Sequence, residues 1–155
     1  MTRIEPLQHR DAATAKQLHD VLMPAYEQEA ALLGLRHCPP LARNSEDVQR
    51  SSDMYFGALR GDELLGAISI GPDDEPGQLC ITMLVVHPAH QRQGAARALL
   101  AEVLRLGQTQ VFAVATGAAN TPALALYREF GFVAYRHGVM GGASVPIVKL
   151  RRKPG

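Results

Sequence analysis

The sequence predicts an α/β fold in which a mixed sheet of about seven strands, with a central parallel pair, is flanked by helices. Strand-like segments at 54–59 and 63–70 flank Gly61-Asp62, which is typical of a hairpin turn, and a third apolar segment follows at 79–86. These three consecutive strands are expected to be antiparallel. A helical segment then leads to the next strand, and a strand, helix, strand connection is a right-handed crossover whose two strands run parallel.

The N-terminal third is predicted to be mostly helical. A helix over 11–23, which Pro24 interrupts, is indicated by apolar residues on one face: Ala15, Leu18, Val21 and Leu22. A second helical segment, 26–33, ends at Gly34, because glycine tolerates the left-handed conformation of a helix end. The other segments of this third are a strand at 2–7, an irregular stretch at 36–43 that contains Pro39-Pro40, and a short helix at 45–50 capped by Asn44 or Ser45.

Two more helices are predicted in the C-terminal half. The first ends at Gly107 and has an apolar stripe made of Ala96, Leu99, Leu100 and Val103. The second covers 122–130, with Thr121 as its N-cap and Gly131 at its end. Pro122 is expected at its first position, where a missing N–H costs nothing. The remaining strands are expected at 111–116, 133–136 and 145–150, and the last of these is predicted to leave an open edge.

Length and composition bound the class of protein. The chain has 155 residues, of which 46% are hydrophobic and 20% charged, as expected for a single folded domain. The net charge of +1 gives no general attraction for nucleic acid or membrane, so neither is expected as a partner. Cys38 and Cys80 are predicted to be reduced thiols, with Cys80 buried in its strand. Because no signal segment or membrane-spanning run is found, a cytoplasmic location is expected.

The stretch 86–100 leads from the most apolar run of the sequence into an amphipathic helix through a glycine-containing loop. Small side chains there let main-chain N–H groups approach a ligand, and the loop residues are Gln91, Arg92, Gln93, Gly94, Ala95 and Ala96. The unpaired donors and dipole of the helix start favour an anion such as pyrophosphate, and Arg92 and Arg97 add positive charge. An ordinary strand-to-helix turn fits the loop by itself equally well. The loop matches neither a Walker motif nor G-x-G-x-x-G.

Two motifs resemble those of the GNAT superfamily of acyl-coenzyme A dependent N-acetyltransferases. QRQGAA fits the pattern Q/R-x-x-G-x-G/A through Gln91, Gly94 and Ala96, and the preceding Val-His-Pro step is also similar. NTPALALYREFGF, which starts at Asn120, resembles the family's helix beside coenzyme A and its penultimate strand. The resemblance implies the GNAT fold, acetyl-CoA as acyl donor, and direct attack by a primary amine of a small molecule or peptide in a ternary complex.

The resemblance also implies a role for each part of these motifs. Main-chain groups at the end of the central strand would pair with the pantetheine arm and stabilise the oxyanion, at Leu84, Val85 and Val86. The loop from Gln91 to Arg97 would hold the pyrophosphate, and Asn120 would contact the pantetheine or its phosphates. Tyr127 would face the sulfur and protonate the departing thiolate as general acid. The residue pattern by itself also allows Tyr127 to be a packing residue.

The central strand carries no carboxylate, whereas many GNAT enzymes have a glutamate there to remove the proton of the amine. The candidates for this role are a water chain, Glu27, His37, His87 and His90. No metal is expected, because His87 and His90 lack a third ligand nearby. The missing carboxylate leaves a second class of function open, a non-catalytic acyl-CoA binding or regulatory module. A doubly wound nucleotide binder is disfavoured, because such folds alternate strand and helix from the start.

Further expectations concern charge, specificity and assembly. The acidic loop 73–75 is predicted to be a solvated turn or, alternatively, to attract a cationic acceptor. The basic tail 151–153 is expected to be solvated and disordered. A homodimer through the open edge at 145–150 is predicted, since the family often closes that edge by dimerising. The segments expected to cover the acceptor side contain Tyr26, Glu27, His37 and Tyr55.

Overall fold

The computed structural model describes residues 2–34, 44–140 and 145–154. In these residues seven strands form one sheet in the order β1-β2-β3-β4-β5-β7-β6, antiparallel throughout except for the parallel pair β4 and β5. The strands are β1 Arg3–Pro6, β2 Met54–Arg60, β3 Glu63–Pro72, β4 Gln78–Val86, β5 Val111–Gly117, β6 Val133–Met140 and β7 Val145–Arg152. The helices are α1 Ala12–Leu32, α2 Ser45–Arg50, the 3-10 helix η2 Pro88–His90, α3 Ala95–Leu106 and α4 Thr121–Glu129. The predicted mixed sheet with a central parallel pair is confirmed.

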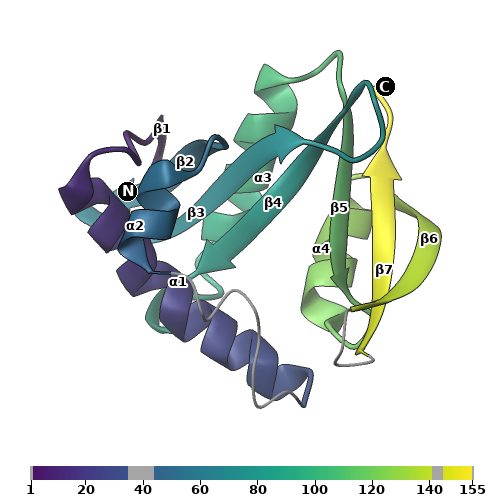
Figure 1. Ribbon diagram of the computed structural model, residues 1–155, viewed down its shortest axis with the longest axis horizontal. Helices are drawn as coiled ribbons and strands as arrows, with labels where there is room; N and C mark the ends of the chain where they lie inside the picture. The colour runs from purple at the N-terminus through teal and green to yellow at the C-terminus, as the bar shows by residue number, and fades with distance from the viewer. Residues whose placement is uncertain (1, 35–43, 141–144, 155) are drawn as a thin grey trace.

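Helices cover both faces of the sheet, with α1 and α2 on one face and α3 and α4 on the other (Figure 1). Because both faces are covered, β3 is apolar on both sides. Leu64 belongs to the core under α1, together with Leu18, and Ile68 belongs to the core under α3, together with Leu99. Burial of each such leucine or isoleucine contributes about 1.5–3 kcal/mol, so the two cores hold the layers together.

One long helix, α1, takes the place of the two helical segments expected on either side of Pro24. Proline removes one helical hydrogen bond, which costs about 3 kcal/mol in a helix interior. The helix buries apolar residues before Pro24, Leu18 and Leu22, and after it, Ala25, so packing outweighs that cost. The expected break is therefore wrong, while the predicted stop is confirmed by Gly34, which has φ 72°. No helix in the described ranges, α1 included, is long and apolar enough to cross a membrane.

The central strands β4 and β5 pair over four residues only, Gln78–Ile81 with Val111–Val114, and then part (Figure 1). On the other side of β4, the pairing with β3 skips Thr82, which forms a bulge and turns the strand. β5 instead continues along β7 as far as Gly117. The edge of β4 that faces β5 therefore has no strand partner from Thr82 to Val86 among the described residues.

At the paired end of β4 and β5, ion pairs join the loop between β3 and β4 to β6 and β7. Lys149 Nζ lies 2.8 Å from an Asp73 oxygen and 2.5 Å from an Asp74 oxygen. Two longer pairs, both of 3.6 Å, join Arg151 to Glu75 and Arg136 to Asp74. The intervening strand β5 presents small residues at this register, since alanines lie opposite Lys149 and Arg151. These residues are called the charged clamp below: Asp73, Asp74, Glu75, Arg136, Lys149 and Arg151.

The charged clamp corrects two expectations from the sequence. The acidic loop is solvated only in part and is not free to attract an acceptor, because the Asp73 side chain is 2% exposed and paired with Lys149, while Asp74 is 71% exposed and paired with the same lysine. Burial by itself would raise the pKa of Asp73, but hydrogen bonds from Lys149 and a main-chain N–H lower it below its ordinary value. The basic tail is not disordered, because Arg151 and Arg152 belong to β7 and Arg152 Nε donates to Phe130 O over 2.8 Å.

The strand at 145–150 is not an open edge, contrary to the prediction. It forms part of β7, which lies between β5 and β6, and the edge strands are β1 and β6. The penultimate strand, β6, runs to Met140 instead of Arg136 and is therefore long enough to pair along β7. The edge through which a homodimer was predicted therefore does not exist. A homodimer as such stays a prediction.

Lys149→Met should remove the cation of the charged clamp and keep most of the apolar stem. Asp73 would then be a buried carboxylate without its cation. We therefore expect the free energy of unfolding at pH 7 to fall by about 3 kcal/mol, measured by urea denaturation.

The matched control is Lys16→Met, which breaks an exposed pair of 3.9 Å with Asp20 and should change stability by less than about 1 kcal/mol. The pKa of Asp73 is lowered in the folded protein. The ionised carboxylate therefore stabilises the fold above its unfolded pKa of about 3.9, and this stabilisation is lost as the pH falls through the pKa of the folded protein. The loss of unfolding free energy in Lys149→Met, relative to the wild type, should therefore become smaller in acid. If Lys149→Met lost no more unfolding free energy at pH 7 than Lys16→Met, the stabilising role of the charged clamp would be contradicted.

Candidate functional site

A cleft of about 1170 Å³ opens where β4 and β5 part, between the free edge of β4, the start of α3, α4 and the C-terminal half of α1. One face of α1 lines it, because the lining residues have the spacing i, i+3, i+4, i+7: Ala25, Gln28, Glu29 and Leu32. All but one of the predicted cofactor-binding residues also line the cleft: Leu84, Val85, Val86, Gln91, Arg92, Gly94, Ala95, Ala96, Arg97, Asn120 and Tyr127. The exception is Gln93, whose Oε1 accepts a hydrogen bond of 2.8 Å from Arg60.

The start of α3 has the features of an anion site. Gly94 is the N-cap residue, with φ 84°, and no side chain in the described part of the chain caps the helix. The first main-chain N–H groups of α3 are therefore left without a side-chain acceptor and can point at a ligand. Arg92 has φ 62°, a left-handed conformation that costs a residue with a side chain about 1 kcal/mol or more and is found mostly at functional loops. The loop geometry favours anion binding over an ordinary turn.

Arg97 is less mobile than the sequence suggests. Its guanidinium lies 2.6 Å from Glu129 Oε2 and 5.8 Å from the centre of the Phe130 ring, so it links α3 to α4. Both charged side chains are more than half exposed, at 56% and 54%. Surface pairs of this kind contribute at most about 1 kcal/mol, so a phosphate can replace Glu129 as the partner of Arg97.

The free edge of β4 supplies main-chain hydrogen-bonding groups to the cleft. Val85 and Val86 are buried on opposite faces of the sheet, in the cores under α1 and α3, so their side chains serve packing. Gln91 anchors the strand end, because its Nε2 donates to Gln28 Oε1 at 2.6 Å and to Val86 O at 3.4 Å. An extended ligand with amide groups can pair with such an edge as an added strand.

Tyr127 is both a packing residue and a cleft residue. It is 5% exposed, and its ring centre lies 5.5 Å from that of Phe132. It also lines the cleft. Burial first, and then the negative charge of Glu29, raise the pKa of its phenol well above the ordinary value. The hydroxyl therefore stays protonated at neutral pH and is available as a hydrogen-bond donor.

Asn120, and not Thr121, is the N-cap of α4, because its Oδ1 accepts a hydrogen bond of 3.3 Å from Ala123 N. The cap lies one residue earlier than predicted, and Pro122 falls at the second helical position, where an N–H would still be unpaired. Nδ2 of Asn120 donates to Glu29 Oε1 over 3.4 Å. The helices α1 and α4 therefore meet at this contact.

Glu29 is a cleft residue that the sequence analysis did not name. Burial raises the pKa of its carboxyl, and the opposing hydrogen bond from Asn120 does not cancel this shift. The expected break at Pro24 left the direction of the second helical segment undefined. A continuous helix would have placed Glu29 on the apolar face, at i+7 from Leu22 and i+4 from Ala25.

The proposed proton acceptors from the sequence are less well placed than Glu29. His87 Nδ1 accepts a hydrogen bond of 3.0 Å from Ala89 N and caps η2. His90 lines the cleft at its loop end, with Nε2 3.4 Å from Glu63. Glu27 is exposed and is not among the cleft residues, and His37 lies outside the described residues. Within the described part of the chain, no three metal-binding side chains are grouped together.

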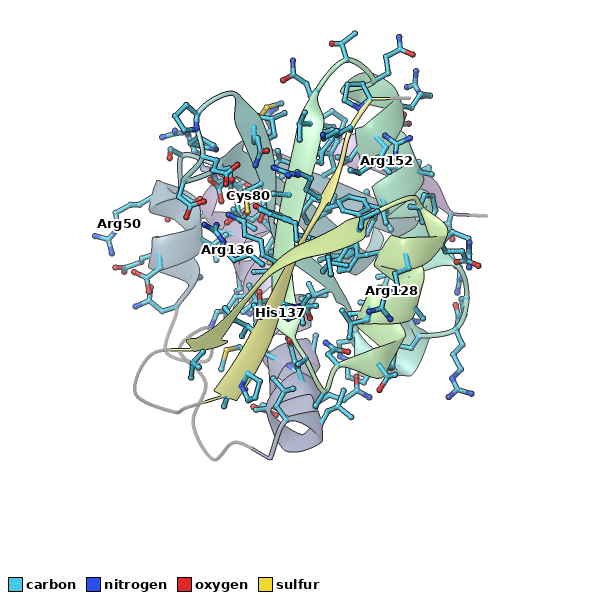
Figure 2. All side chains as sticks on the ribbon, turned by 90° about the vertical axis from the view of Figure 1, so that its right-hand side faces the viewer. Arg50, Cys80, Arg128, Arg136, His137 and Arg152 are labelled. Atoms are coloured by element: carbon cyan, nitrogen blue, oxygen red, sulfur yellow. The ribbon has the colours of Figure 1, made fainter. Side chains whose placement is uncertain are left out.

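A second hollow, of about 390 Å³, is bordered by Cys80, His137 and four residues of the charged clamp, Asp73, Asp74, Arg136 and Lys149. Figure 2 views the molecule from the β6 side and labels Cys80, Arg136 and His137. Burial, and then the charge of Asp73, raise the pKa of Cys80 to about 11, so the thiol is protonated at neutral pH. Cys80 is half-buried and not fully buried as predicted, and Cys38 lies outside the described residues. Tyr55 is 2% exposed, so it is a core residue and not an acceptor-side residue.

The fold and the cleft define a class of protein in which an extended ligand with amide and anionic groups can lie along the free edge of β4 and reach the start of α3. The sequence profile of the acetyltransferase (GNAT) family matches residues 15–132, and the chain belongs to this family.

Two relatives show how far the sequence similarity extends. Over 130 residues, 83% of the chain, it is 36% identical to the protein YqkA of Bacillus subtilis. Over 96 residues, 61% of the chain, it is 34% identical to the N-alpha-acetyltransferase RimI of Mycobacterium tuberculosis. The chain spans only part of these relatives, 37% of the length of the first and 60% of the second.

Solved structures share the fold at lower identity. A ribosomal-protein-alanine N-acetyltransferase from Escherichia coli has a TM-score of 0.76 at 15% identity, over 100% of this chain and 95% of the other. The PaiA N-acetyltransferase of Thermoplasma acidophilum, in complex with coenzyme A, has a TM-score of 0.74 at 14% identity, over 99% of each chain. These likenesses show that the whole described sheet and its helices follow one known architecture.

Proposed function

We propose that the chain is an N-acetyltransferase that moves the acetyl group of acetyl-CoA to a primary amine of a small molecule or peptide. The observation that carries the proposal is the free edge of β4, which leads through η2 and the loop from Gln91 to the uncapped start of α3. Membership of the acetyltransferase family supports it. So do the coenzyme A complex of the Thermoplasma acidophilum neighbour and the name of the Mycobacterium tuberculosis relative.

In this proposal, acetyl-CoA binds with its pyrophosphate at the loop from Gln91 to Arg97. The N–H groups of the first turn of α3 and the Arg92 guanidinium then face the phosphate oxygens. The pantetheine arm lies along β4, where its amides pair with main-chain groups from Leu84 to Val86, and Asn120 borders the other side. This arrangement brings the thioester to the point where β4 and β5 part, beside Tyr127.

The proposed reaction is direct attack of the amine on the thioester in a ternary complex. The amine nitrogen bonds to the carbonyl carbon, and main-chain N–H groups of β4 donate to the oxyanion that forms. The C–S bond then breaks, and Tyr127 donates its proton to the sulfur. The raised pKa of Tyr127 keeps that proton on the phenol until negative charge develops on the sulfur.

Release of the coenzyme A thiol in the presence of an amine tests this function. A peptide that begins with alanine is the first probe, because the neighbour from Escherichia coli acts on an alanine. Free amino acids, polyamines and aminoglycosides complete the panel. Thiol release that depends on an amine would support acetyl transfer. Binding of acetyl-CoA without release for any amine would contradict it and favour the non-catalytic acyl-CoA binding module.

Gly94→Glu should weaken acetyl-CoA binding by about tenfold or more in calorimetry, because the added carboxylate repels the phosphates and a side chain at this φ is strained. The matched control is Gly77→Glu. Gly77 has φ 83° and equally open surroundings, but it lies in the loop between β3 and β4, outside the cleft. The control should bind as the wild type does. Wild-type affinity in Gly94→Glu would contradict the phosphate site.

Tyr127→Phe should lower kcat by about 10² or more, because the packing ring stays and the proton donor is lost. Acetyl-CoA affinity should stay within about twofold of the wild-type value. Tyr135→Phe is the matched control, since the Tyr135 hydroxyl is buried without a partner among the described residues and its loss should leave turnover unchanged. Unchanged turnover in Tyr127→Phe, with chemistry limiting the rate, would leave packing as the role of Tyr127.

A further inference from the structure

The proposed reaction needs a group that takes a proton from the amine. An alkyl ammonium group has a pKa of about 10 and an α-amino group of about 8, so both are largely protonated at pH 7 and cannot attack. The strand β4 carries no carboxylate. The described residues bring two carboxylates to the cleft, Glu29 from α1 and Glu129 from α4.

The two carboxylates differ in their partners. Glu129 is more than half exposed, and its carboxylate already has a cationic partner, Arg97, at 2.6 Å. Glu29 contacts the neutral amide of Asn120 at 3.4 Å and has no ion pair among the described residues. Its burial raises the pKa of the carboxyl, which makes it a stronger base than an exposed glutamate.

Glu29 also faces α4, the helix that carries Tyr127. It contacts the first residue before α4, and its charge acts on the phenol of Tyr127. The other ionisable groups that face this phenol, Tyr26 from α1 and Cys80 from β4, carry no positive charge. Among the four residues by which α1 lines the cleft, Glu29 is the only ionisable one. The acid and the base of the reaction would therefore come from different helices.

We propose that Glu29 accepts the proton of the acceptor ammonium group and so generates the amine that attacks acetyl-CoA; this role rests on the proposed function. The ammonium gives one proton to the Glu29 carboxylate, the nitrogen lone pair forms the N–C bond, and the C–S bond breaks. The sulfur takes the proton of Tyr127, and the phenolate regains one from the nitrogen of the new amide. Glu29 then releases its proton to water, which leaves the amide, the thiol and one proton.

The pH dependence of kcat/KM tests this role with the peptide that begins with alanine. In the wild type, the reactive pair is the Glu29 carboxylate with the ammonium form, so kcat/KM should be nearly flat between about pH 6 and pH 8. In Glu29→Gln, the reactive form is the free amine, so kcat/KM should rise about tenfold per pH unit up to its pKa of about 8. The ratio of wild-type kcat/KM to that of Glu29→Gln should thus be about 100-fold larger at pH 6 than at pH 8.

Two variants separate proton transfer from a structural effect. Glu29→Asp keeps a carboxylate and should keep the flat profile at a lower rate. Glu27→Gln removes an exposed carboxylate two residues away on the same helix and should match the wild type. Acetyl-CoA affinity, measured by calorimetry, should be unchanged in Glu29→Gln, because glutamine can still accept the hydrogen bond from Asn120.

The outcomes distinguish the two proposals. Parallel pH profiles for the wild type and Glu29→Gln, at any overall rate, would overturn the role of Glu29 and leave acetyl transfer intact. A flat profile in Glu29→Asp combined with unit slope in Glu29→Gln would establish the role. If another amine of the panel is the better acceptor, the break in the Glu29→Gln profile should move to the pKa of that amine. Absence of amine-dependent thiol release by the wild type would overturn the proposed function and with it the role of Glu29.

Discussion

The parting of β4 from β5 is the constraint on which the rest of the structure depends. If the parallel pair continued, ladder hydrogen bonds would occupy the N–H and C=O groups of β4 from Thr82 onward, and no edge would remain for a ligand. The bulge at Thr82 turns β4 away, while β5 stays paired with β7 on its other edge, so the two strands diverge. The charged clamp ties the paired end of the two strands to β6 and β7, so the sheet opens at one end only.

The same parting determines how the helices wall the cleft. β4 and β5 run parallel, and each is followed by a helix, so the starts of α3 and α4 lie at the same open end. Ligands of open α/β sheets bind beyond the carboxyl ends of the strands for this reason. α1 closes the remaining side because it continues through Pro24, and a helix that stopped there would not place Gln28, Glu29 and Leu32 in the wall.

The sequence was sufficient for features that depend on neighbouring residues. Glycine, caps and apolar spacing predicted the sheet, the loop before α3 and the helix after Asn120, although Asn120 and Thr121 are both good caps and the choice between them was wrong. Contacts between distant segments were not predictable. Asp73 meets Lys149 across 76 residues, and Glu29 meets Asn120 across 91. A charged residue is predicted to be solvated until the fold brings its partner to it, which explains why these contacts were missed.

Charge along the cleft can sort the two substrates of the proposed reaction. The start of α3 and Arg92 favour anionic phosphates, whereas Glu29, on the α1 wall of the cleft, is a half-buried carboxylate without an ion pair among the described residues. Such a carboxylate repels a phosphate and attracts an ammonium ion, and burial strengthens both effects. Acetyl-CoA would then bind with its phosphates at the start of α3 and away from Glu29, and the amine would be drawn to the α1 wall. Proton transfer between ammonium and carboxylate leaves both groups neutral, and a half-buried site favours neutral forms. The burial that raises the pKa of Glu29 thus also favours the uncharged amine that attack requires.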